Sequence, residues 1–399
     1  MHDRPSRLGI WVFALSITAM TCVWRIAHRS FRQDFGIPSL EPSGIDFRAV
    51  YHWASALRRG GGEYFSPEYW NNVYPPLTTA MFVPFTLLSE SAAYRLYAVA
   101  LWVFLFALIA RAVAIPARFR WTDHGWPTLT CFVLLAASYP VLFAIERGNS
   151  DITAAFLIVL FLGWMLEDRP ALAITALTLA TQMKVYPAIL AALIGVRRGL
   201  RVAALFVGIN VALLLALGWR AFDFFRGNLT RFTQTRSCWE GNHSLACYLR
   251  EYGVESVQPY SAVLLAAFGA AALALYLGAV RHKWLPRDSF TLAEVSLTGM
   301  AFSLMSLVPS VSHDYKLPIH AVPFLLLLNV SLPEGDRSRL ALRIGIPLIS
   351  VLVSFLFPPR EWYKAPVLLC LFAAYGLLLL SGIRSHGATR SNGGSTVPA

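Results

Sequence analysis

The chain has 399 residues, of which 56% are hydrophobic and only 14% are charged. A soluble domain of this length needs a polar exterior that this composition cannot supply, so lipid must cover most of the surface. Long apolar runs without period-two alternation favour membrane-spanning helices over the strands of a closed barrel. The net charge of +12 would suggest nucleic acid for a soluble protein. Here positively charged cytoplasmic loops explain part of it, and we expect no nucleic-acid partner.

The apolar runs predict an all-α, multi-pass membrane protein in which residues 1–384 form one transmembrane domain. Each run is close to the ~20 residues that cross a bilayer, or somewhat shorter. The short pair 170–183 and 185–196 is either a re-entrant hairpin broken between Lys184 and Pro187 or two thin, tilted helices. About twelve membrane segments are expected, over residues 9–27, 91–114, 127–145, 151–166, 170–183, 185–196, 202–218, 260–280, 291–309, 316–331, 339–357 and 363–383.

Basic residues in the short loops predict the orientation of these segments. Lys and Arg gather on one side of the predicted topology, near residues 111–120, 197–201, 281–287 and 337–339. This side is predicted to be cytoplasmic and to hold both termini, with a disordered tail over residues 385–399 that is rich in Gly, Ser and Thr. The extracytoplasmic side then carries residues 28–90, 146–150, 219–259, 310–315 and 358–362.

The first extracytoplasmic loop, 28–90, contains two predicted interfacial elements. Residues 45–57 have apolar side chains at helical spacing with charges between them, which predicts an amphipathic helix on the membrane surface. A second element begins at Tyr74-Pro75-Pro76-Leu77, because proline suits the first turn of a helix. Asp46, at the start of the first helix, is either a first-turn acid favoured by the helix dipole or a general base for an acceptor hydroxyl.

Two short polar stretches interrupt the apolar runs further along. Residues 146–151, Glu-Arg-Gly-Asn-Ser-Asp, are either a solvated turn in which Asp151 caps the next helix or a set of hydrogen-bonding groups suited to a sugar. Lys184 lies within an apolar region. An ionisable residue at membrane depth indicates a functional site, although a lysine that reaches to the interface is the alternative.

The second large extracytoplasmic loop, 219–259, contains several arginines, two cysteines and the sequence Gly241-Asn242-His243-Ser244. Cys238 and Cys247 could form a local disulfide if the loop lies in an oxidising compartment, but one sequence cannot establish the pairing. Further on, His313 and Asp314 could orient a base or bind a metal. No other ligand spacing completes a metal site, so we expect none. Nucleotide-binding glycine loops are absent and no cofactor is expected.

These motifs together resemble glycosyltransferase family 87, whose members are polyprenyl-phosphate-mannose-dependent mannosyltransferases with the membrane C-type (GT-C) fold. The resemblance rests on Asp46-Phe47 with Val50-Tyr51, a glycine turn over 60–64, Tyr74-Pro75-Pro76-Leu77, Lys184-Val185-Tyr186-Pro187, Gly241-Asn242-His243-Ser244, and His313 with Tyr315. It covers roughly residues 45–330. A Gly-Gln-Asn-like turn is common in the family where this chain has Arg147-Gly148-Asn149, which leaves the sugar identity open.

The resemblance implies inverting transfer of a sugar, usually mannose, from a polyprenyl phosphate to a hydroxyl of a lipid or glycan acceptor. The site would face outward from a bacterial plasma membrane. Asp46 would be the general base, and the donor phosphate would be held by Lys184, Arg147 and Tyr186. The residues expected to bind substrate are Tyr74, Glu146, Asn149, Asn242, His243, His313 and Tyr315.

Two other classes of protein remain open at this point. Charged residues at membrane depth and broken helices also suit a lipid or sugar transporter, although a transporter often has two related halves and the sequence contains no internal repeat. A non-catalytic membrane scaffold would leave Lys184 unexplained.

Overall fold

The computed structural model describes residues 43–60, 62–69, 71–114, 138–235, 238, 241–254, 256, 258–281, 292–309, 312–328 and 361–392. Within these ranges the protein is helical, as the sequence predicts, with one isolated β-bridge between Asn242 and His313. The predicted segments 9–27 and 339–357, and most of 127–145, lie outside the described residues.

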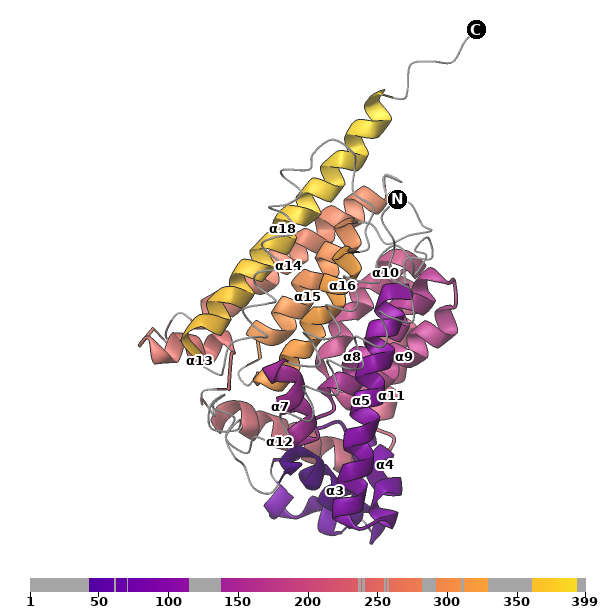
Figure 1. Ribbon diagram of the computed structural model, residues 1–399, viewed down its shortest axis with the longest axis vertical. Helices are drawn as coiled ribbons and strands as arrows, with labels where there is room; N and C mark the ends of the chain where they lie inside the picture. The colour runs from indigo at the N-terminus through magenta and orange to yellow at the C-terminus, as the bar shows by residue number, and fades with distance from the viewer. Residues whose placement is uncertain are drawn as a thin grey trace, which may run out of the picture.

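Two groups of helices form the body of the molecule (Figure 1). In the first, α8 (Asp151–Leu166) packs between α5 (Glu90–Ala114) and α9 (Pro170–Met183), while α10 (Ala191–Arg198) packs against α11 (Leu200–Leu214). In the second, α15 (Leu292–Leu307) contacts α14 (Gln258–Arg281), α16 (Ala321–Leu328) and α18 (Glu361–Asn392). The buried faces of both groups join in one apolar core.

Several helices coincide with predicted segments: α5 with 91–114, α8 with 151–166, α9 with 170–183 and α15 with 291–309. Among the described residues, Glu90–Ala112 and Lys364–Ser381 are each long and apolar enough to cross a membrane. Two bent pairs would add to these if each pair is one span: α7 (Tyr139–Arg147) with α8, bent by 113°, and α11 with α12 (Trp219–Thr235), bent by 98°. The described residues therefore hold two such helices, or up to four, and the total of about twelve membrane segments stays a prediction.

Large apolar side chains cover the outer faces of several helices. On α5, Leu96, Val99, Val103 and Phe106 are exposed, and α11 and α14 show similar faces. Surfaces of this kind are unfavourable in water and suit contact with lipid, as the composition requires.

The extracytoplasmic elements predicted from the sequence gather at one end of the bundle (Figure 1). The predicted interfacial helix is α3 (Ile45–Arg58), and it buries Phe47, Val50 and Trp53. The second predicted element is α4 (Pro76–Phe82), continued by η3 (Val83–Leu87). The ring of Phe47 lies 5.9 Å from that of Phe82 and 5.2 Å from that of Tyr97, so aromatic packing fixes α3 against α4 and α5.

The C-terminal helix corrects one prediction. Residues from Ser385 were expected to be disordered, but α18 continues through Asn392, while 393–399 lie outside the described residues. Glycine and serine lower helix propensity without forbidding a helix, and α18 is already formed by the apolar turns that precede this stretch.

Candidate active site

Two glycines bring the start of α3 into contact with the end of α7. Gly44, with φ 82°, donates its backbone N–H to the Glu146 carbonyl at 2.8 Å. Gly148 ends α7 with φ 64°. A Cβ on Gly44 would lie 2.6 Å from the Tyr94 ring, and one on Gly148 would lie 2.6 Å from the Phe47 Cβ. The close approach and the positive φ values both require glycine at these positions.

This contact places the Asp46 carboxylate on the Arg147 guanidinium. Arg147 Nη2 donates to Oδ1 at 2.6 Å and Arg147 Nε donates to Oδ2 at 2.9 Å. Asn149 Nδ2 also donates to Oδ2, at 2.7 Å. A carboxylate offers about four acceptor positions. Three are used here, and Oδ1 keeps one acceptor position for another donor.

Arg147 sets the protonation state of Asp46. Burial of the carboxyl group acts to raise its pKa, but the hydrogen bonds and charge of Arg147, helped by Asn149 and Lys184, hold the pKa of Asp46 below its usual value. Asp46 is therefore a carboxylate at neutral pH. Its side chain is 16% exposed, so a hydroxyl group can reach it.

Lys184 lies where α9 ends. The helix ends at Met183, Lys184 is extended with φ −147° and ψ 130°, and η4 (Tyr186–Leu190) follows. If α9 continued, Pro187 would have no N–H to donate to the Met183 carbonyl and its ring would clash with it, which explains the break predicted at this position. Lys184 Nζ donates to the Tyr74 hydroxyl at 3.2 Å and lies 4.5 Å from the centre of that ring.

A buried acid compensates the charge of Lys184. Asp151 Oδ2 lies 3.2 Å from Lys184 Nζ, and Asp151 Oδ1 accepts a 2.6 Å hydrogen bond from the Tyr186 hydroxyl. The Asp151 side chain is fully buried. The sequence predicts Asp151 as a helix cap or as one of the sugar-binding groups of residues 146–151, but its pairing with Lys184 has no local pattern.

Tyr315 joins the two charged pairs. Its ring centre lies 5.6 Å from the Arg147 guanidinium carbon and 5.7 Å from Lys184 Nζ. The His313 ring lies 5.2 Å from the Tyr315 ring. Burial, opposed in part by the Asp46 charge, lowers the pKa of His313 to about 3, so His313 is neutral at physiological pH.

A separate, buried polar network holds the backbone segments next to this site. His243 Nδ1 lies 3.2 Å from Asp314 Oδ1, its Nε2 lies 3.0 Å from the Ser312 hydroxyl, and Lys364 binds the other oxygen of Asp314. Asn242 Oδ1 accepts the backbone N–H groups of Ser244 at 3.0 Å and Ser312 at 3.1 Å. These side chains are all buried, and they tie the 241–247 segment to the backbone that carries His313 and Tyr315.

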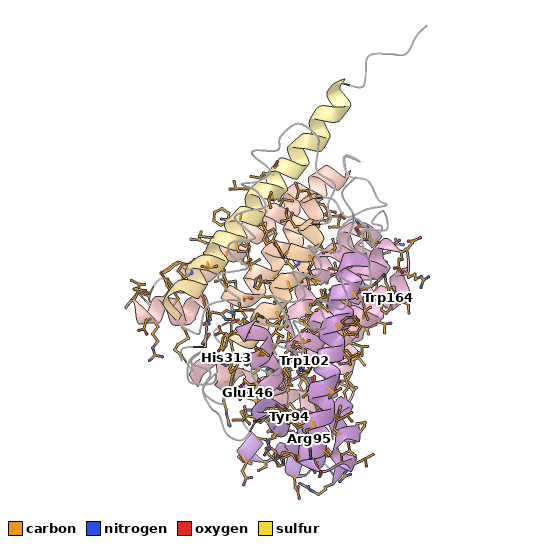
Figure 2. All side chains as sticks on the ribbon, in the orientation of Figure 1. Tyr94, Arg95, Trp102, Glu146, Trp164 and His313 are labelled. Atoms are coloured by element: carbon orange, nitrogen blue, oxygen red, sulfur yellow. A yellow bond between two sulfur atoms is a disulfide. The ribbon has the colours of Figure 1, made fainter. Side chains whose placement is uncertain are left out.

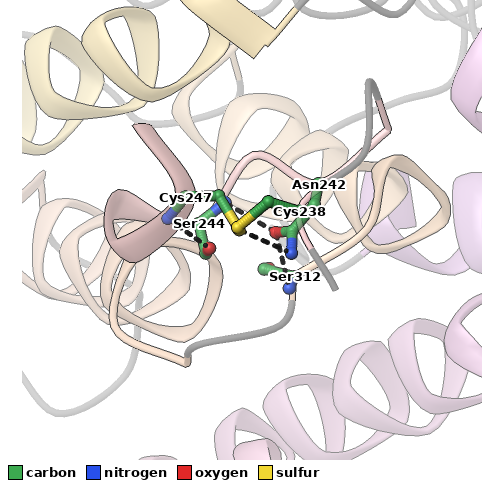
Figure 3. Close-up of a disulfide and its surroundings, with 5 residues drawn as sticks. All are labelled: Cys238, Asn242, Ser244, Cys247 and Ser312. Carbon is green, nitrogen blue, oxygen red and sulfur yellow. Dashed lines mark hydrogen bonds between the residues drawn. A yellow bond between two sulfur atoms is a disulfide. The ribbon is translucent and has the colours of Figure 1, made fainter. Parts of the chain in front are cut away.

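A disulfide stabilises the same segment. Cys238 and Cys247 are bonded, with their Cα atoms 5.4 Å apart, which decides the pairing that the sequence leaves open. Asn242 Nδ2 donates to the Cys247 sulfur at 3.1 Å, so the amide joins the disulfide to Ser312 (Figure 3).

The structure thus divides the predicted site residues into two groups. Asp46, Arg147, Asn149, Tyr74, Lys184, Tyr186, His313 and Tyr315 form one connected cluster. Asn242 and His243 bond to Ser312 and Asp314 instead. Glu146 contributes its backbone carbonyl, which accepts hydrogen bonds from the Gly44 N–H and from the Tyr94 hydroxyl. Glu146 and Tyr94 lie at the same end of the molecule as His313 (Figure 2).

Two lysines outside the predicted site also lie near it, Lys316 beside the cluster and Lys364 in the separate polar network. Lys316 Nζ lies 5.0 Å from the centre of the Tyr186 ring and is buried, and Lys364 binds Asp314. Both lie in apolar sequence that predicts membrane segments. The signal available for Lys316 was its position three residues after His313.

The fold and the site define a helical membrane protein that holds a buried cluster of acids, cations and aromatic rings at one end of its bundle. A family model, glycosyltransferase family 87, matches residues 72–309, which is more than half of the chain, and the chain belongs to this family. It is therefore a membrane glycosyltransferase. No match was found among curated proteins. The matched range includes Arg147 and Lys184, whereas Asp46, His313 and Tyr315 lie beyond its ends.

Proposed function

We propose that this protein is an inverting glycosyltransferase with the GT-C fold. It transfers a sugar, mannose in the favoured case, from a polyprenyl-phosphate donor to a hydroxyl of a glycolipid or glycan. We place the reaction on the outer face of a bacterial plasma membrane, where the two extracytoplasmic loops contribute the site. The observation that carries the proposal is the single connected cluster in which Asp46 has one acceptor position left and a second cation, Lys184, lies apart from the acid.

The proposed reaction uses the two ends of this cluster differently. Asp46 accepts the proton of the acceptor hydroxyl, and the oxygen attacks the anomeric carbon of the donor sugar. The bond between that carbon and the phosphate oxygen breaks, and polyprenyl phosphate leaves with the bonding electron pair. The leaving phosphate gains negative charge, so fixed cations stabilise the transition state. Lys184 is placed to bind it, beside the Tyr74 and Tyr186 hydroxyls.

Arg147 has two possible partners in this reaction. Without substrate it binds Asp46 through two hydrogen bonds. A donor phosphate is a strong competitor for the same planar group. We propose that donor binding draws Arg147 partly toward the phosphate, which weakens its hold on Asp46 and makes the carboxylate a better base in the ternary complex.

The test is transfer of radiolabelled mannose from polyprenyl-phosphate mannose by the purified protein in lipid nanodiscs, with a glycolipid extract of bacterial envelopes as acceptor. Asp46→Asn is expected to lose turnover by at least about a hundredfold, because a general base contributes roughly 10²–10⁴-fold. Donor binding should be retained or strengthened, because Arg147 is no longer held by a carboxylate, and retained binding shows that the variant is folded. Retained turnover in this variant would remove Asp46 from the base role.

A transporter is the remaining alternative class. Loading the protein into sealed liposomes and following movement of the labelled lipid between leaflets separates the two. Movement without formation of a glycosylated product would contradict the proposal.

A further inference from the structure

An apolar groove adjoins the candidate active site. It has a volume of about 410 Å³ and is lined by η4 and α10 on one side and by α14 and α15 on the others. This volume falls within the roughly 300–1,000 Å³ typical of small-molecule pockets. The lining is almost wholly apolar, and it includes Ile189, Leu193, Ala270, Leu273, Leu297 and Met305.

One end of this groove meets the charged cluster. Tyr186 lines the groove, and its hydroxyl donates to Asp151, which is paired with Lys184. The buried Lys316 Nζ lies 5.0 Å from the centre of the Tyr186 ring. A ligand with an apolar chain in the groove and an anionic head beyond Tyr186 would therefore place its charge near two lysines.

The other end of the groove lies next to a buried polar cluster. Arg197 Nε donates to Glu294 Oε1 at 2.7 Å, and the Tyr276 hydroxyl donates to the same oxygen at 2.6 Å. These residues lie about one helical turn beyond Leu193, Leu273 and Thr298, which line the groove. They come from α10, α14 and α15, so one cluster ties together the three walls.

The groove also faces the expected lipid. Ala266 and Ala270 of α14 line it and are exposed. An apolar chain can therefore enter sideways from a membrane, without passing through water.

We propose that this α10–α14–α15 groove binds the first isoprene units of the polyprenyl donor, the units next to the phosphate. The identity of the lipid rests on the proposed function. The argument is continuity: the prenyl chain is esterified to the phosphate, so its binding site must begin where the phosphate ends, and Tyr186 borders both. Asp46, which would bind the acceptor, contacts this region indirectly, through Arg147 and Tyr315.

The groove would orient the prenyl chain by its shape, and hydrophobic transfer would contribute little to binding. Lipid tails are already as apolar as leucine, so a chain gains little by leaving the bilayer. A groove of fixed walls orients the chain and thereby aligns the sugar–phosphate bond with the acceptor. Filling the groove should therefore impair long-chain donors strongly and have little effect on a donor whose prenyl chain is too short to enter it.

The experiment compares two substitutions on one helix. Ala270→Phe fills the groove, whereas Ala267→Phe places the same side chain on an exposed part of α14 that does not line it. A polyprenyl phosphate with a photoreactive diazirine near its phosphate end is cross-linked to the protein in nanodiscs, and the labelled residues are found by mass spectrometry. We expect label on α14 and α15 in the wild type and in Ala267→Phe, and a loss of about tenfold, equivalent to ~1.4 kcal/mol, in Ala270→Phe.

Ala192→Phe, on the opposite wall formed by α10, gives a second groove-filling variant should Ala270→Phe fail to fold. The transfer assay adds an independent measurement: both groove variants should lose kcat/KM for the long-chain donor and keep it for the short-chain donor. Equal loss with both donors would overturn the proposal. So would label outside the groove, or label displaced as readily by excess phosphatidylglycerol or by glycolipid acceptor as by polyprenyl phosphate.

The outcomes also separate this proposal from the proposed function. Groove labelling without sugar transfer in the wild type would retain the lipid site and reject the glycosyl transfer. Transfer with unaffected groove variants would retain the enzyme and reject the groove.

Discussion

At the scale of single residues, the chemistry of the site depends on which cation neutralises which acid. Arg147 binds Asp46 and Lys184 binds Asp151, so the cluster consists of two ion pairs joined through Tyr315. Within this arrangement the same substitution, loss of a cation, has different consequences at the two positions. Loss of Arg147 changes the pKa of the base, Asp46. Loss of Lys184 changes the phosphate site and leaves the buried Asp151 without its cation.

The pH dependence of activity should report the Asp46–Arg147 pair. Activity needs the carboxylate form, and Arg147 holds the pKa of Asp46 down against burial. The acidic limb of kcat/KM should therefore lie below about pH 4 in the wild type, near or under the ordinary aspartate pKa. In Arg147→Gln burial is less opposed, so the pKa rises and the limb should move up by about one pH unit or more. The neutral His313 should add no limb between pH 5 and pH 8.

The control for that profile is Lys184→Ala, because Lys184 makes no hydrogen bond to Asp46 and only its charge acts on the carboxylate. The acidic limb of kcat/KM should therefore shift less in Lys184→Ala than in Arg147→Gln. Profiles that coincide in the wild type and in Arg147→Gln would show that Arg147 does not set the protonation of the base.

Lys184 should also control donor affinity, and a double substitution separates this from stability. Lys184→Ala leaves the fully buried Asp151 uncompensated, which costs about 3–5 kcal/mol when one partner of a buried pair is lost. Adding Asp151→Asn removes that charge and should restore most of the melting temperature. Donor affinity should stay at least tenfold below wild type in the double variant, since a charge-assisted bond to phosphate is worth about 1.5–3 kcal/mol. Calorimetric titration with polyprenyl phosphate measures this affinity. If donor affinity recovered together with the melting temperature in the double variant, Lys184 would act only through Asp151.

At the scale of elements, the sequence predicted the local features and missed most pairings. The helix of residues 45–57 and the break at Lys184 follow from apolar spacing and from Pro187, and both occur. The pairing of Asp46 with Arg147 spans 101 residues and that of Lys184 with Tyr74 spans 110, so no local pattern encodes them. Asn242 and His243 were placed with the substrate because their polarity is visible in sequence, whereas their buried partners are not.

The approach of α3 to α7 gives a prediction at this scale. Gly148→Ala places a residue at φ 64°, which costs about 1–2 kcal/mol, and its Cβ would also push against Phe47. We expect the displacement of α3 to separate Asp46 from Arg147 and to lower kcat much more than the melting temperature. Gly253→Ala is the matched control, because Gly253 has φ 68° and nothing within 4 Å of the added Cβ. Its activity should stay near wild type, and equal activity losses in both variants would contradict the positional role.

At the scale of the whole molecule, the composition was the most informative part of the sequence. It predicted an all-helical membrane protein, and the fold and the family agree with that class. The number of membrane segments stays a prediction, because several predicted segments lie outside the described residues and because bent or short helices do not follow the simple length rule. Orientation follows from loop charge alone and stays a prediction.

The predicted orientation can be tested by the side from which single cysteines react. In a background that keeps only Cys238 and Cys247, which are bonded to each other, His52→Cys reports the exposed face of α3 and Leu200→Cys reports the turn between α10 and α11. A membrane-impermeant maleimide added to intact spheroplasts should label His52→Cys and spare Leu200→Cys until the membrane is broken. This outcome is expected because the arginines around Leu200 keep that turn cytoplasmic. The opposite pattern would put Asp46 on the cytosolic side, where the proposed outward-facing transfer could not occur. Labelling of both positions in sealed cells would indicate a leaky preparation, which release of a cytosolic marker enzyme detects.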